Sequence, residues 1–398
     1  MLSKSEKYPE LASKNECTGC MACVDICPTD ALKSYMAEDG HIYVALEGDK
    51  CVKCKKCEQI CKSSRGKYGD NKLYKSKVYA AWSLNEEERE KATSGGVFAA
   101  LARKVIEKGG VVVGAYLDGR ECKHIMIEKI EEIEKLQGSK YMASSMNGIY
   151  KIIKNELSRR LVLFSGVGCQ CAGVLAFFEN SPYRDNLITV DLVCGGAPSH
   201  LLLDKFYDHY PKIEKIISYR NKDKYELRVL ENGKERILCE KNLPLHGFNC
   251  ELTNRFSCYQ CQFACAHRLT DITIGDLWNY NYLVDEHSKG ISTIIIHTKK
   301  GMSTLMEANI LLNGLKWSQC INYCKRIVCG ESHIFRPRKN LVENSKKMKF
   351  DEFTKLYCIA MKPLDFKMEV FRIYRFLIIR FGDYKIKKYI KKLLKEFE

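Results

Sequence analysis

The sequence predicts a small, cysteine-rich α+β domain, then a larger α/β domain with a mixed sheet, and a helical C-terminal tail. The first 70 residues hold eight closely spaced cysteines, which is typical of a domain held by metal rather than by a large core. From residue 78 to about 335, apolar strands alternate with amphipathic helices, as in α/β folds. The rest is basic and helical in pattern. We therefore expect domains over 1–70, 78–335 and 336–398.

The composition favours a globular, cytoplasmic protein. Of the 398 residues, 45% are hydrophobic, which excludes disorder as the main state. No stretch approaches the roughly 18–20 uncharged apolar residues of a spanning helix, and the start MLSKSEKYPE lacks the apolar region of a signal peptide. In such a chain, 21 cysteines indicate bound metal rather than disulfides.

Two four-cysteine runs occupy the first 70 residues. They are Cys17-x2-Cys20-x2-Cys23-x3-Cys27 and Cys51-x2-Cys54-x2-Cys57-x3-Cys61. This is the spacing of the bacterial two-cluster ferredoxin, in which the fourth cysteine of each run ligates the other cluster. Zinc sites use C-x2-C pairs and need only four ligands. We therefore predict a ferredoxin-like domain with two [4Fe-4S] clusters, one on Cys17, Cys20, Cys23 and Cys61, the other on Cys51, Cys54, Cys57 and Cys27.

The net charge of +16 is of a size often found in nucleic-acid-binding proteins. Three Cys-ligated clusters, each with roughly two negative charges, would offset about six of these charges. The remainder suits acidic protein partners, phosphate-rich cofactors or an anionic membrane surface. We expect no nucleic-acid partner.

The α/β region contains six candidate strands and five candidate helices. The strands lie at 111–116, 122–127, 161–165, 187–193, 271–275 and 291–298, and the helices at 96–108, 147–159, 170–179, 199–209 and 303–312. Residues 225–239 predict a hairpin that turns at Asn232-Gly233. The polar, basic stretch 63–77 is interpreted as a linker.

Five motifs in a fixed order carry a resemblance to a known family. They are Ser94-Gly95-Gly96-Val97, Gly138-Ser139-Lys140-Tyr141, SGVGCQCAG at 165–173, Cys194-Gly195-Gly196, and RFSCYQCQFACAHRLTDITIGDLWN at 255–279. Over about residues 78–330, the sequence resembles the coenzyme F-420 hydrogenase/dehydrogenase beta-subunit family. Its relatives include deazaflavin-oxidising subunits and the hydroxymethyl-chlorophyll reductases of plants. The resemblance implies a flavoprotein with FAD and a third [4Fe-4S] cluster.

The implied FAD site falls on two of these motifs. Ser94, Gly95 and Gly96 precede a helix, whose N-terminal N–H groups can bind a diphosphate, and glycine permits close approach. Ser139 and Lys140 lie in a turn from which the lysine could add a cation. The alternatives are that Ser94 caps the helix and that Lys140 is a solvated surface lysine. The stretch 165–173 lacks the G-x-G-x-x-G spacing, so we expect no Rossmann NAD site.

The implied third cluster has Cys258-x2-Cys261 as its anchor pair. The other ligands must come from Cys169, Cys194 or Cys265. Cys169 and Cys194 each follow a strand, and strand ends of parallel sheets meet at one edge. We therefore expect Cys194, Cys258 and Cys261, with Cys169 as the fourth ligand and Cys265 as its competitor. Structural zinc or buried thiols are the alternative.

Other candidate residues have weaker patterns. The resemblance places Asp271, Asp276 and Trp278 beside flavin and cluster, whereas the residues alone suit a buried strand with solvated ends. Cys171 is expected in the core. Cys320, Cys324 and Cys329 have roughly helical spacing, which favours core over metal.

The C-terminal stretch 366–398 has ten Lys/Arg and four Asp/Glu. Ile386, Tyr389, Ile390, Leu393 and Leu394 form an apolar stripe at helical spacing. The stretch suits a helix that docks on a membrane surface or a partner subunit, or one that packs on its own protein.

The function expected from these features is that of an iron–sulfur flavoprotein oxidoreductase. It would couple a two-electron (hydride) step at FAD to one-electron transfer through [4Fe-4S] clusters, because a flavin can exchange both. The electron partner would be a reduced deazaflavin coenzyme or ferredoxin. The alternatives are a ferredoxin-dependent reductase of an organic substrate and a non-catalytic electron-transfer subunit. No motif marks a catalytic acid or base.

Overall fold

The computed structural model describes residues 7–65, 68–222, 226–238, 253–277 and 288–323, with the single residues 248, 251, 286, 327, 350 and 352. The chain divides into two compact units, Met1–Lys346 and Lys347–Glu398. Every element described below belongs to the first unit. The predicted C-terminal stripe lies outside the described residues, as do Trp278, Cys324 and Cys329.

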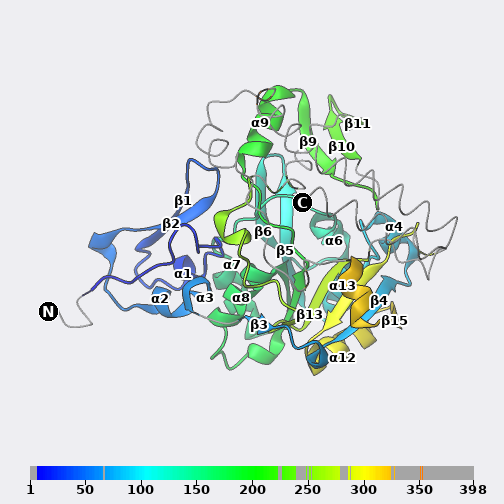
Figure 1. Ribbon diagram of the computed structural model, residues 1–398, viewed down its shortest axis with the longest axis horizontal. Helices are drawn as coiled ribbons and strands as arrows, with labels where there is room; N and C mark the ends of the chain where they lie inside the picture. The colour runs from blue at the N-terminus through cyan, green and yellow to red at the C-terminus, as the bar shows by residue number, and fades with distance from the viewer. Residues whose placement is uncertain are drawn as a thin grey trace, which may run out of the picture. The chain divides into compact units, whose positions relative to one another are not determined.

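An eight-stranded mixed sheet forms the centre of the first unit (Figure 1). Its order is β15-β4-β14-β13-β8-β7-β5-β6. The strands are β4 (Lys77–Ser83), β5 (Val111–Asp118), β6 (Glu121–Ile127), β7 (Val162–Val167), β8 (Leu187–Leu192), β13 (Ile272–Asp276), β14 (Ser292–Ile296) and β15 (Ile310–Gly314). The four neighbours β13, β8, β7 and β5 are parallel, and the outer pairings are antiparallel. The predicted mixed sheet is confirmed.

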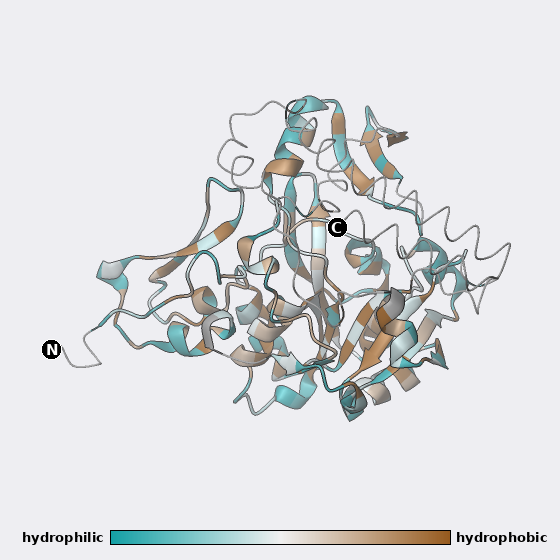
Figure 2. Ribbon diagram, viewed as in Figure 1, coloured by the Kyte–Doolittle hydropathy of each residue, from teal (hydrophilic) through white to brown (hydrophobic). Residues whose placement is uncertain are grey.

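Helices cover both faces of the sheet. The helices α5 (Val97–Glu107), α6 (Ile133–Leu136) and α12 (Lys299–Glu307) lie on one face, and α7 (Ile149–Leu157) and α8 (Gly168–Phe177) lie on the other. Successive side chains of a strand point to opposite faces of the sheet. Val112 therefore packs in the core beneath α5, while Val111 and Val113 pack in the core beneath α7 and α8. Figure 2 shows hydrophobic central strands beneath helices of mixed character.

The N-terminal segment packs against α7 and α8 (Figure 1). It consists of α1 (Ala22–Asp25), β1 (Leu32–Met36), β2 (Ile42–Leu46), α2 (Lys56–Ile60) and α3 (Lys62–Arg65), and β1 and β2 form an antiparallel pair. Met21, Ala22 and Ile60 share a buried core with α7 and α8. The segment is therefore stabilised by apolar contacts with the sheet domain as well as by any metal. Its ferredoxin-like arrangement remains a prediction.

The stretch 63–77, interpreted above as a linker, is anchored in part. Tyr68 is 4% exposed and belongs to the same core. Directly after it, β3 (Gly69–Asp70) pairs antiparallel with β12 (His267–Arg268). The polar composition of the stretch did not predict this attachment, because only the Tyr68 side chain and the backbone of Gly69 and Asp70 form it.

A smaller three-stranded sheet has the order β11-β10-β9. It consists of β9 (Ile213–Ser218), β10 (Leu227–Glu231) and β11 (Lys234–Leu238), and α9 (Leu201–His209) precedes it. The turn residues Asn232 and Gly233 both have positive φ, 50° and 71°, as a tight hairpin turn requires. The predicted hairpin is confirmed.

The predicted bounds of the helix at 303–312 are wrong, because the helix covers Lys299–Glu307 and residues 310–314 form a strand. Helix α12 begins at Lys299, because the side chain of Thr298 accepts a hydrogen bond from the N–H of Gly301 and caps it. The chain then forms β15, which pairs with β4 at the edge of the sheet. The apolar residues of 310–312 suit either a helix or a strand, and the partner strand decides. Strands β4 and β9 were also missed.

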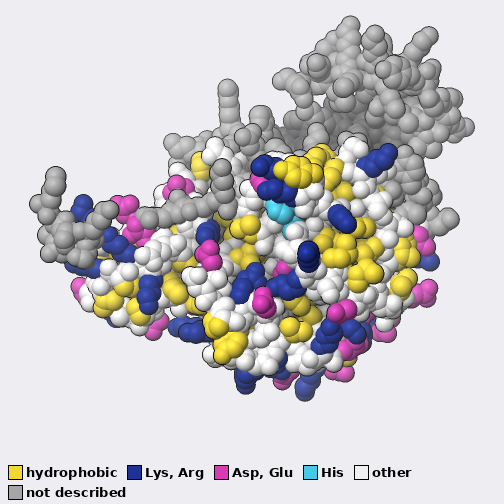
Figure 3. All heavy atoms as spheres, turned by 90° about the horizontal axis from the view of Figure 1, so that it is seen from below, with side chains coloured by type: hydrophobic (Ala, Val, Ile, Leu, Met, Phe, Trp, Pro, Cys, Tyr) yellow, Lys and Arg dark blue, Asp and Glu magenta, His cyan; other side chains and the backbone are white. Residues whose placement is uncertain are grey.

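The remaining elements are short. They are α4 (Glu86–Lys91), α13 (Trp317–Tyr323), η1 (Gly48–Lys50), η2 (Leu73–Lys75), η3 (Ile130–Glu132), η4 (Arg184–Asn186) and η5 (Phe256–Cys258). Among the described residues, no helix has the length and apolarity to span a membrane. On the face shown in Figure 3, Lys and Arg are interspersed with Asp and Glu.

Candidate metal centres and cofactor site

The thiols predicted for the first cluster lie close together, and we call this group the first site. Burial raises the pKa of Cys23, and the charges of Cys20, Cys17 and Cys61 raise it further. Burial also raises the pKa of Cys20 to about 11. Cys61 therefore joins the first run although it belongs to the second. Four thiols that repel one another as thiolates form a donor set that suits bound iron.

The second site is the predicted group Cys27, Cys51, Cys54 and Cys57. Burial raises the pKa of Cys57, and the charges of Cys27 and Cys54 raise it further, so Cys27 lies close to two thiols of the second run. The N–H of Ala31 donates to Cys27 Sγ at 3.2 Å. Cys54 is exposed.

The two runs have the same backbone turns. Gly19 and Met21 have φ of 72° and 61°, and Lys53 and Lys55, at the equivalent positions, have φ of 57° and 59°. Left-handed residues turn successive N–H groups inward. In the first run, the N–H groups of Gly19 and Ala22 donate to the cysteine thiols, as expected around a bound cluster.

A third site comprises Cys169, Cys194, Cys258 and Cys261. Cys169 lies at the start of α8 after β7, Cys194 follows β8, and Cys258 ends η5. Burial raises the pKa of Cys169 well above its usual value, and the charges of the other three thiols add to this. The pKa of Cys258 rises to about 12 for the same reasons. The ends of the neighbouring parallel strands β7 and β8 bring Cys169 and Cys194 together, and the η5 segment adds Cys258 and Cys261.

Cys265 has a different environment from these four. Its thiol donates to the carbonyl oxygen of His267 at 3.4 Å, and a Cβ on Gly69 would lie 2.6 Å from its sulfur. The charge of Cys261 also acts on Cys265, but it is Cys169 on which the charges of Cys194, Cys258 and Cys261 all act. Cys171 and Cys320 are both fully buried in apolar cores, as expected.

No group of three or more His, Cys, Asp or Glu side chains within the described ranges is tight enough to hold a single metal ion. A four-iron cluster takes one thiolate for each iron. Its ligands therefore stand further apart than those around one ion.

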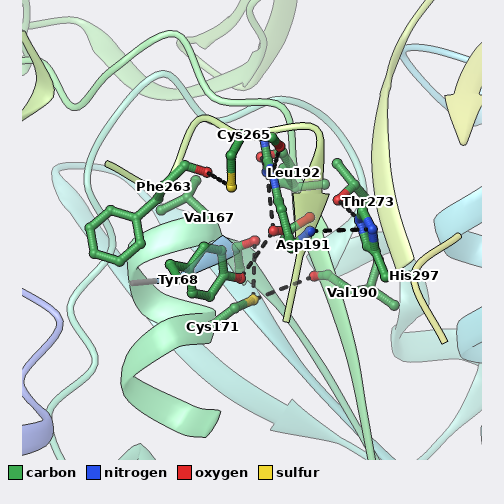
Figure 4. Close-up of polar contacts among 12 residues, drawn as sticks. Tyr68, Val167, Cys171, Val190, Asp191, Leu192, Phe263, Cys265, Thr273 and His297 are labelled. Carbon is green, nitrogen blue, oxygen red and sulfur yellow. Dashed lines mark hydrogen bonds and ion pairs between the residues drawn. The ribbon is translucent and has the colours of Figure 1, made fainter. Parts of the chain in front are cut away.

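A buried polar network joins the end of β8 to the segment that carries Cys265 (Figure 4). Asp191, 0% exposed, accepts hydrogen bonds from Arg268 Nη1 and the Tyr68 hydroxyl, each at 3.1 Å. Arg268 also donates to the carbonyl oxygen of Cys265 at 3.0 Å. This network fixes the end of the N-terminal segment to the cysteine-bearing loop.

The Ser94-Gly95-Gly96 loop is anchored to the sheet. The N–H of Gly95 donates to Ser292 Oγ at 3.0 Å, and Ser94 Oγ donates to the carbonyl oxygen of Ile291 at 3.0 Å. A Cβ on Gly95 would lie 2.5 Å from the carbonyl oxygen of Ala81. Gly96, with φ of 78°, is the N-cap of α5, and no side chain caps this helix. The alternative of Ser94 as capping residue is therefore wrong.

The second predicted loop lies next to the first. Ser139 Oγ is 3.3 Å from Thr93 Oγ1. Lys140 Nζ donates to the carbonyl oxygens of Leu136 and Gln137 at 2.8 and 2.7 Å, which closes the C-terminus of α6. Burial lowers the pKa of Lys140 to about 8. Lys140 is thus a half-buried, bonded lysine and not a solvated one.

Two further cations at these loops were missed from the sequence. Arg220 donates to the carbonyl oxygen of Thr93 at 3.3 Å and to Asp276 at 2.7 Å. Lys222 donates to the carbonyl oxygens of Arg89 and Ala92, and burial, then Arg89, lowers its pKa to about 8. The basic stretch 220–224 could have indicated these two cations. It was not used, because the preceding strand β9 was not predicted.

The two aspartates of the DITIGD segment differ. Asp276 pairs with Arg220 at the loops just described. Asp271 is buried and accepts hydrogen bonds from Thr189 and Thr298. It therefore holds β8 and the cap of α12, which is a structural role.

Comparison with known proteins gives three family matches. Residues 78–151 and 159–311 match the N-terminal and C-terminal parts of coenzyme F420 hydrogenase/dehydrogenase, beta subunit. Residues 16–64 match a 4Fe-4S dicluster domain. Among solved structures, the chain is similar to one from the F420-reducing [NiFe] hydrogenase complex of Methanosarcina barkeri, with 18% identity, 71% of this chain and 91% of that chain covered, and a TM-score of 0.45. No curated protein matches.

Proposed function

Because the chain belongs to the coenzyme F420 hydrogenase/dehydrogenase beta subunit family and carries an N-terminal 4Fe-4S dicluster domain, we propose that it is an iron–sulfur flavoprotein oxidoreductase. It couples a two-electron (hydride) step at FAD to one-electron transfer through three [4Fe-4S] clusters. Its electron partner is a reduced deazaflavin coenzyme or ferredoxin, and its site of action is the cytoplasm. Partner subunits or a membrane surface would engage the basic C-terminal stretch.

The meeting of the third-site thiols beside the first site carries this proposal. Cys169, Cys194 and the Cys258/Cys261 pair come from three separate segments, and the charge of Cys20 also acts on Cys169. The side chain of Cys20 packs against Gly173, where a Cβ would lie 3.2 Å from its sulfur. Gly173 is one helical turn after Cys169 on the same face of α8. Electrons could therefore pass between the two sites over a short distance.

The loops at the start of α5 suit an FAD diphosphate. The uncapped helix start offers N–H groups at a positive dipole end. Ser139 and Arg220 contact Thr93, next to the same loop, and Lys140 follows Ser139 in the chain. In this proposal, Ser94 and Gly95 shape the loop, while Gly96 and the first turn of α5 face the phosphates. Bound FAD would supply the exchange between two-electron and one-electron chemistry.

Two other functions use the same sites. A ferredoxin-dependent reductase of an organic substrate would run the electrons in the opposite direction. A non-catalytic subunit would hold clusters without accepting electrons from a small molecule. Assays of the anaerobic protein with reduced deazaflavin and with reduced ferredoxin separate the deazaflavin-linked function from the ferredoxin-dependent reductase. A flavin that neither donor reduces would indicate the non-catalytic subunit.

Iron and flavin analysis of the anaerobically purified protein tests the proposal directly. We expect about twelve irons per chain, four for each [4Fe-4S] cluster, and one non-covalent FAD. Cys258→Ser with Cys261→Ser should remove about four irons and leave the other two clusters, because the sites are separately ligated. A wild-type protein with about eight irons and no flavin would refute the proposal.

Single serine substitutions decide the fourth ligand of the third site. Cys169→Ser should disturb the spectrum or iron content of the third cluster, whereas Cys265→Ser should leave both as in the wild type. Cys171→Ser is the matched control on the same helix, since this thiol faces the core. The reverse pattern would assign Cys265 as the ligand.

FAD binding should weaken with rising pH and on loss of Lys140. The ammonium of Lys140, with a pKa of about 8, is charged below this pH, so affinity for the diphosphate is highest there and falls above it. Lys140→Ala should lower the affinity by roughly ten- to a hundredfold and flatten the pH profile.

Titration of FAD into flavin-free protein between about pH 6.5 and 9.5 measures both effects. The control is Lys135→Ala, which removes an exposed lysine of α6 that pairs with Glu132, five residues before Lys140, and it should change neither. Gly95→Val is not informative, because its side chain would collide with Ala81 and disturb the sheet. Unchanged affinity in Lys140→Ala would move the FAD site away from this loop.

A further inference from the structure

Arg255 is a buried cation three residues before Cys258. Its side chain is 2% exposed. Its Nη1 donates to the carbonyl oxygen of Cys17 at 3.2 Å and its Nη2 to that of Ile42 at 2.7 Å. The guanidinium carbon lies 4.7 Å from the centre of the Tyr43 ring. These contacts hold a full positive charge between the first-run loop and the third-site loop.

Among the described residues, Arg255 differs from the other buried arginines in that no carboxylate pairs with it. Three arginines are buried to a similar degree and each has an acidic partner: Arg89 with Glu286, Arg220 with Asp276 and Arg268 with Asp191. No ion pair in the described part of the chain includes Arg255, and its Nε has no hydrogen-bond partner there. Since a buried charge without a counter-charge is costly, buried arginines are almost always paired.

The surroundings of Arg255 are two groups of thiols. Its guanidinium contacts the backbone of Cys17 in the first site. The backbone carbonyl oxygen of Arg255 accepts a hydrogen bond from the N–H of Cys258, in the third site, at 2.9 Å. Gly19 makes room for the guanidinium, because a Cβ there would lie 2.8 Å from Nη2. A cluster ligated by four cysteines carries about two negative charges when oxidised.

We infer that Arg255 is the shared counter-cation of the first and third cluster sites. The inference rests on the proposed function, because it requires clusters at both groups of thiols. It gives an order to the cysteine sites: the first site neighbours the third, and the second site, with its exposed Cys54, lies at the end of the series. A one-electron carrier protein would meet the chain there, gaining the one electron that the second site loses, or the reverse.

The physical effect of this placement is on reduction potential. Net charge close to a cluster is one of the factors that set its potential. A positive charge favours the added electron, so Arg255 raises the potentials of the first and third sites together. Arg255 makes no hydrogen bond to the described backbone of the second site; its hydrogen bonds go to Cys17 and Ile42. Loss of the charge should therefore lower two of the three potentials.

An anaerobic redox titration followed by electron paramagnetic resonance tests the inference. In Arg255→Gln, the ratio of reduced to oxidised first and third clusters at a fixed potential should fall about tenfold, which is about 59 mV for a one-electron couple. The second cluster should shift much less. The Cys258→Ser/Cys261→Ser protein assigns the signal of the third cluster. Unchanged potentials in Arg255→Gln with full iron content would overturn the inference.

Two further variants separate charge from structure. Arg255→Lys keeps the charge and should restore most of the shift. Ser257→Ala removes a different hydrogen bond to the same carbonyl oxygen of Cys17, at 3.2 Å, without a change in charge, and should leave the potentials unchanged. If Arg255→Gln loses iron while Arg255→Lys keeps it, the counter-cation role is supported; if both lose it equally, the role is refuted. A wild-type protein without a third cluster would instead refute the proposed function.

Discussion

The two four-cysteine runs have identical spacing and the same left-handed turns, yet the first halves of the two runs have opposite surroundings. Between the cysteines of the first run, Met21 and Ala22 are each 1% exposed and lie in the core shared with α7 and α8. In the second run, Val52 is 62% exposed and Cys54 is exposed. The cysteine spacing sets the kind of cluster, and the residues between the cysteines decide which cluster faces the sheet domain.

This difference has a consequence for electron transfer. Equal spacing gives each run the same ligands, so nothing in the ligands alone orders the two sites. The apolar first run is drawn into the core, which places Cys20 against α8 near Cys169. The first half of the second run, with Lys55 and Lys56 at the equivalent positions, stays nearer the surface, although Cys57 and Ile60 in its second half are buried. The first site is therefore the inner one, next to the sheet domain, and the second site is the outer one, with its exposed Cys54.

The largest expected effect separates Met21 from Lys55, which occupy the same position in the two runs. Met21→Ala should destabilise the protein by about 2–5 kcal/mol, because it leaves a cavity in the shared core. Lys55→Ala should change the free energy of unfolding by about 1 kcal/mol or less, because Lys55 is only half-buried and its loss leaves no cavity in an apolar core. Anaerobic urea unfolding measures both. Equal effects would show that the two runs are packed alike.

A smaller effect separates Gly19 from Lys53, the other equivalent pair. Gly19→Ala should cost about 1–3 kcal/mol, because alanine is strained at a φ of 72° and its Cβ would press on Arg255. Lys53 already has a side chain in the same conformation, so Lys53→Ala should be close to neutral. The same unfolding experiment, with iron content as a second readout, checks this. A harmless Gly19→Ala would mean that the guanidinium does not occupy this space.

The smallest expected effect is kinetic. During brief exposure to an iron chelator, the second site should lose iron faster than the first, because thiol reactivity follows exposure. Alkylation followed by mass spectrometry should label Cys54 before Cys20. Labelling in the opposite order would contradict the assignment of an outer and an inner site.

The sequence predicted which thiols lie close together better than it predicted the residues around them. Cysteine spacing predicted the groups of the first two sites, and the resemblance together with strand-end positions predicted Cys169, Cys194, Cys258 and Cys261. Ligand spacing is a local property, because one short loop wraps one cluster. The two loops predicted to share a site, which carry Ser94, Gly95 and Lys140, are neighbours through the contact of Thr93 with Ser139. Their hydrogen bonds to the chain itself were not foreseeable, since the partners lie far away in sequence.

What the sequence determined by itself was therefore the local pattern: the two four-cysteine runs, the alternating strands and helices, and the hairpin at Asn232-Gly233. What only the tertiary structure decided was pairing between distant segments. The strand at 310–314 depends on β4, and the buried Tyr68 depends on the core beneath it. Arg255 gains its meaning only when the first run is folded against its loop. Charge and packing act through space, so residues more than 200 positions apart can set one site.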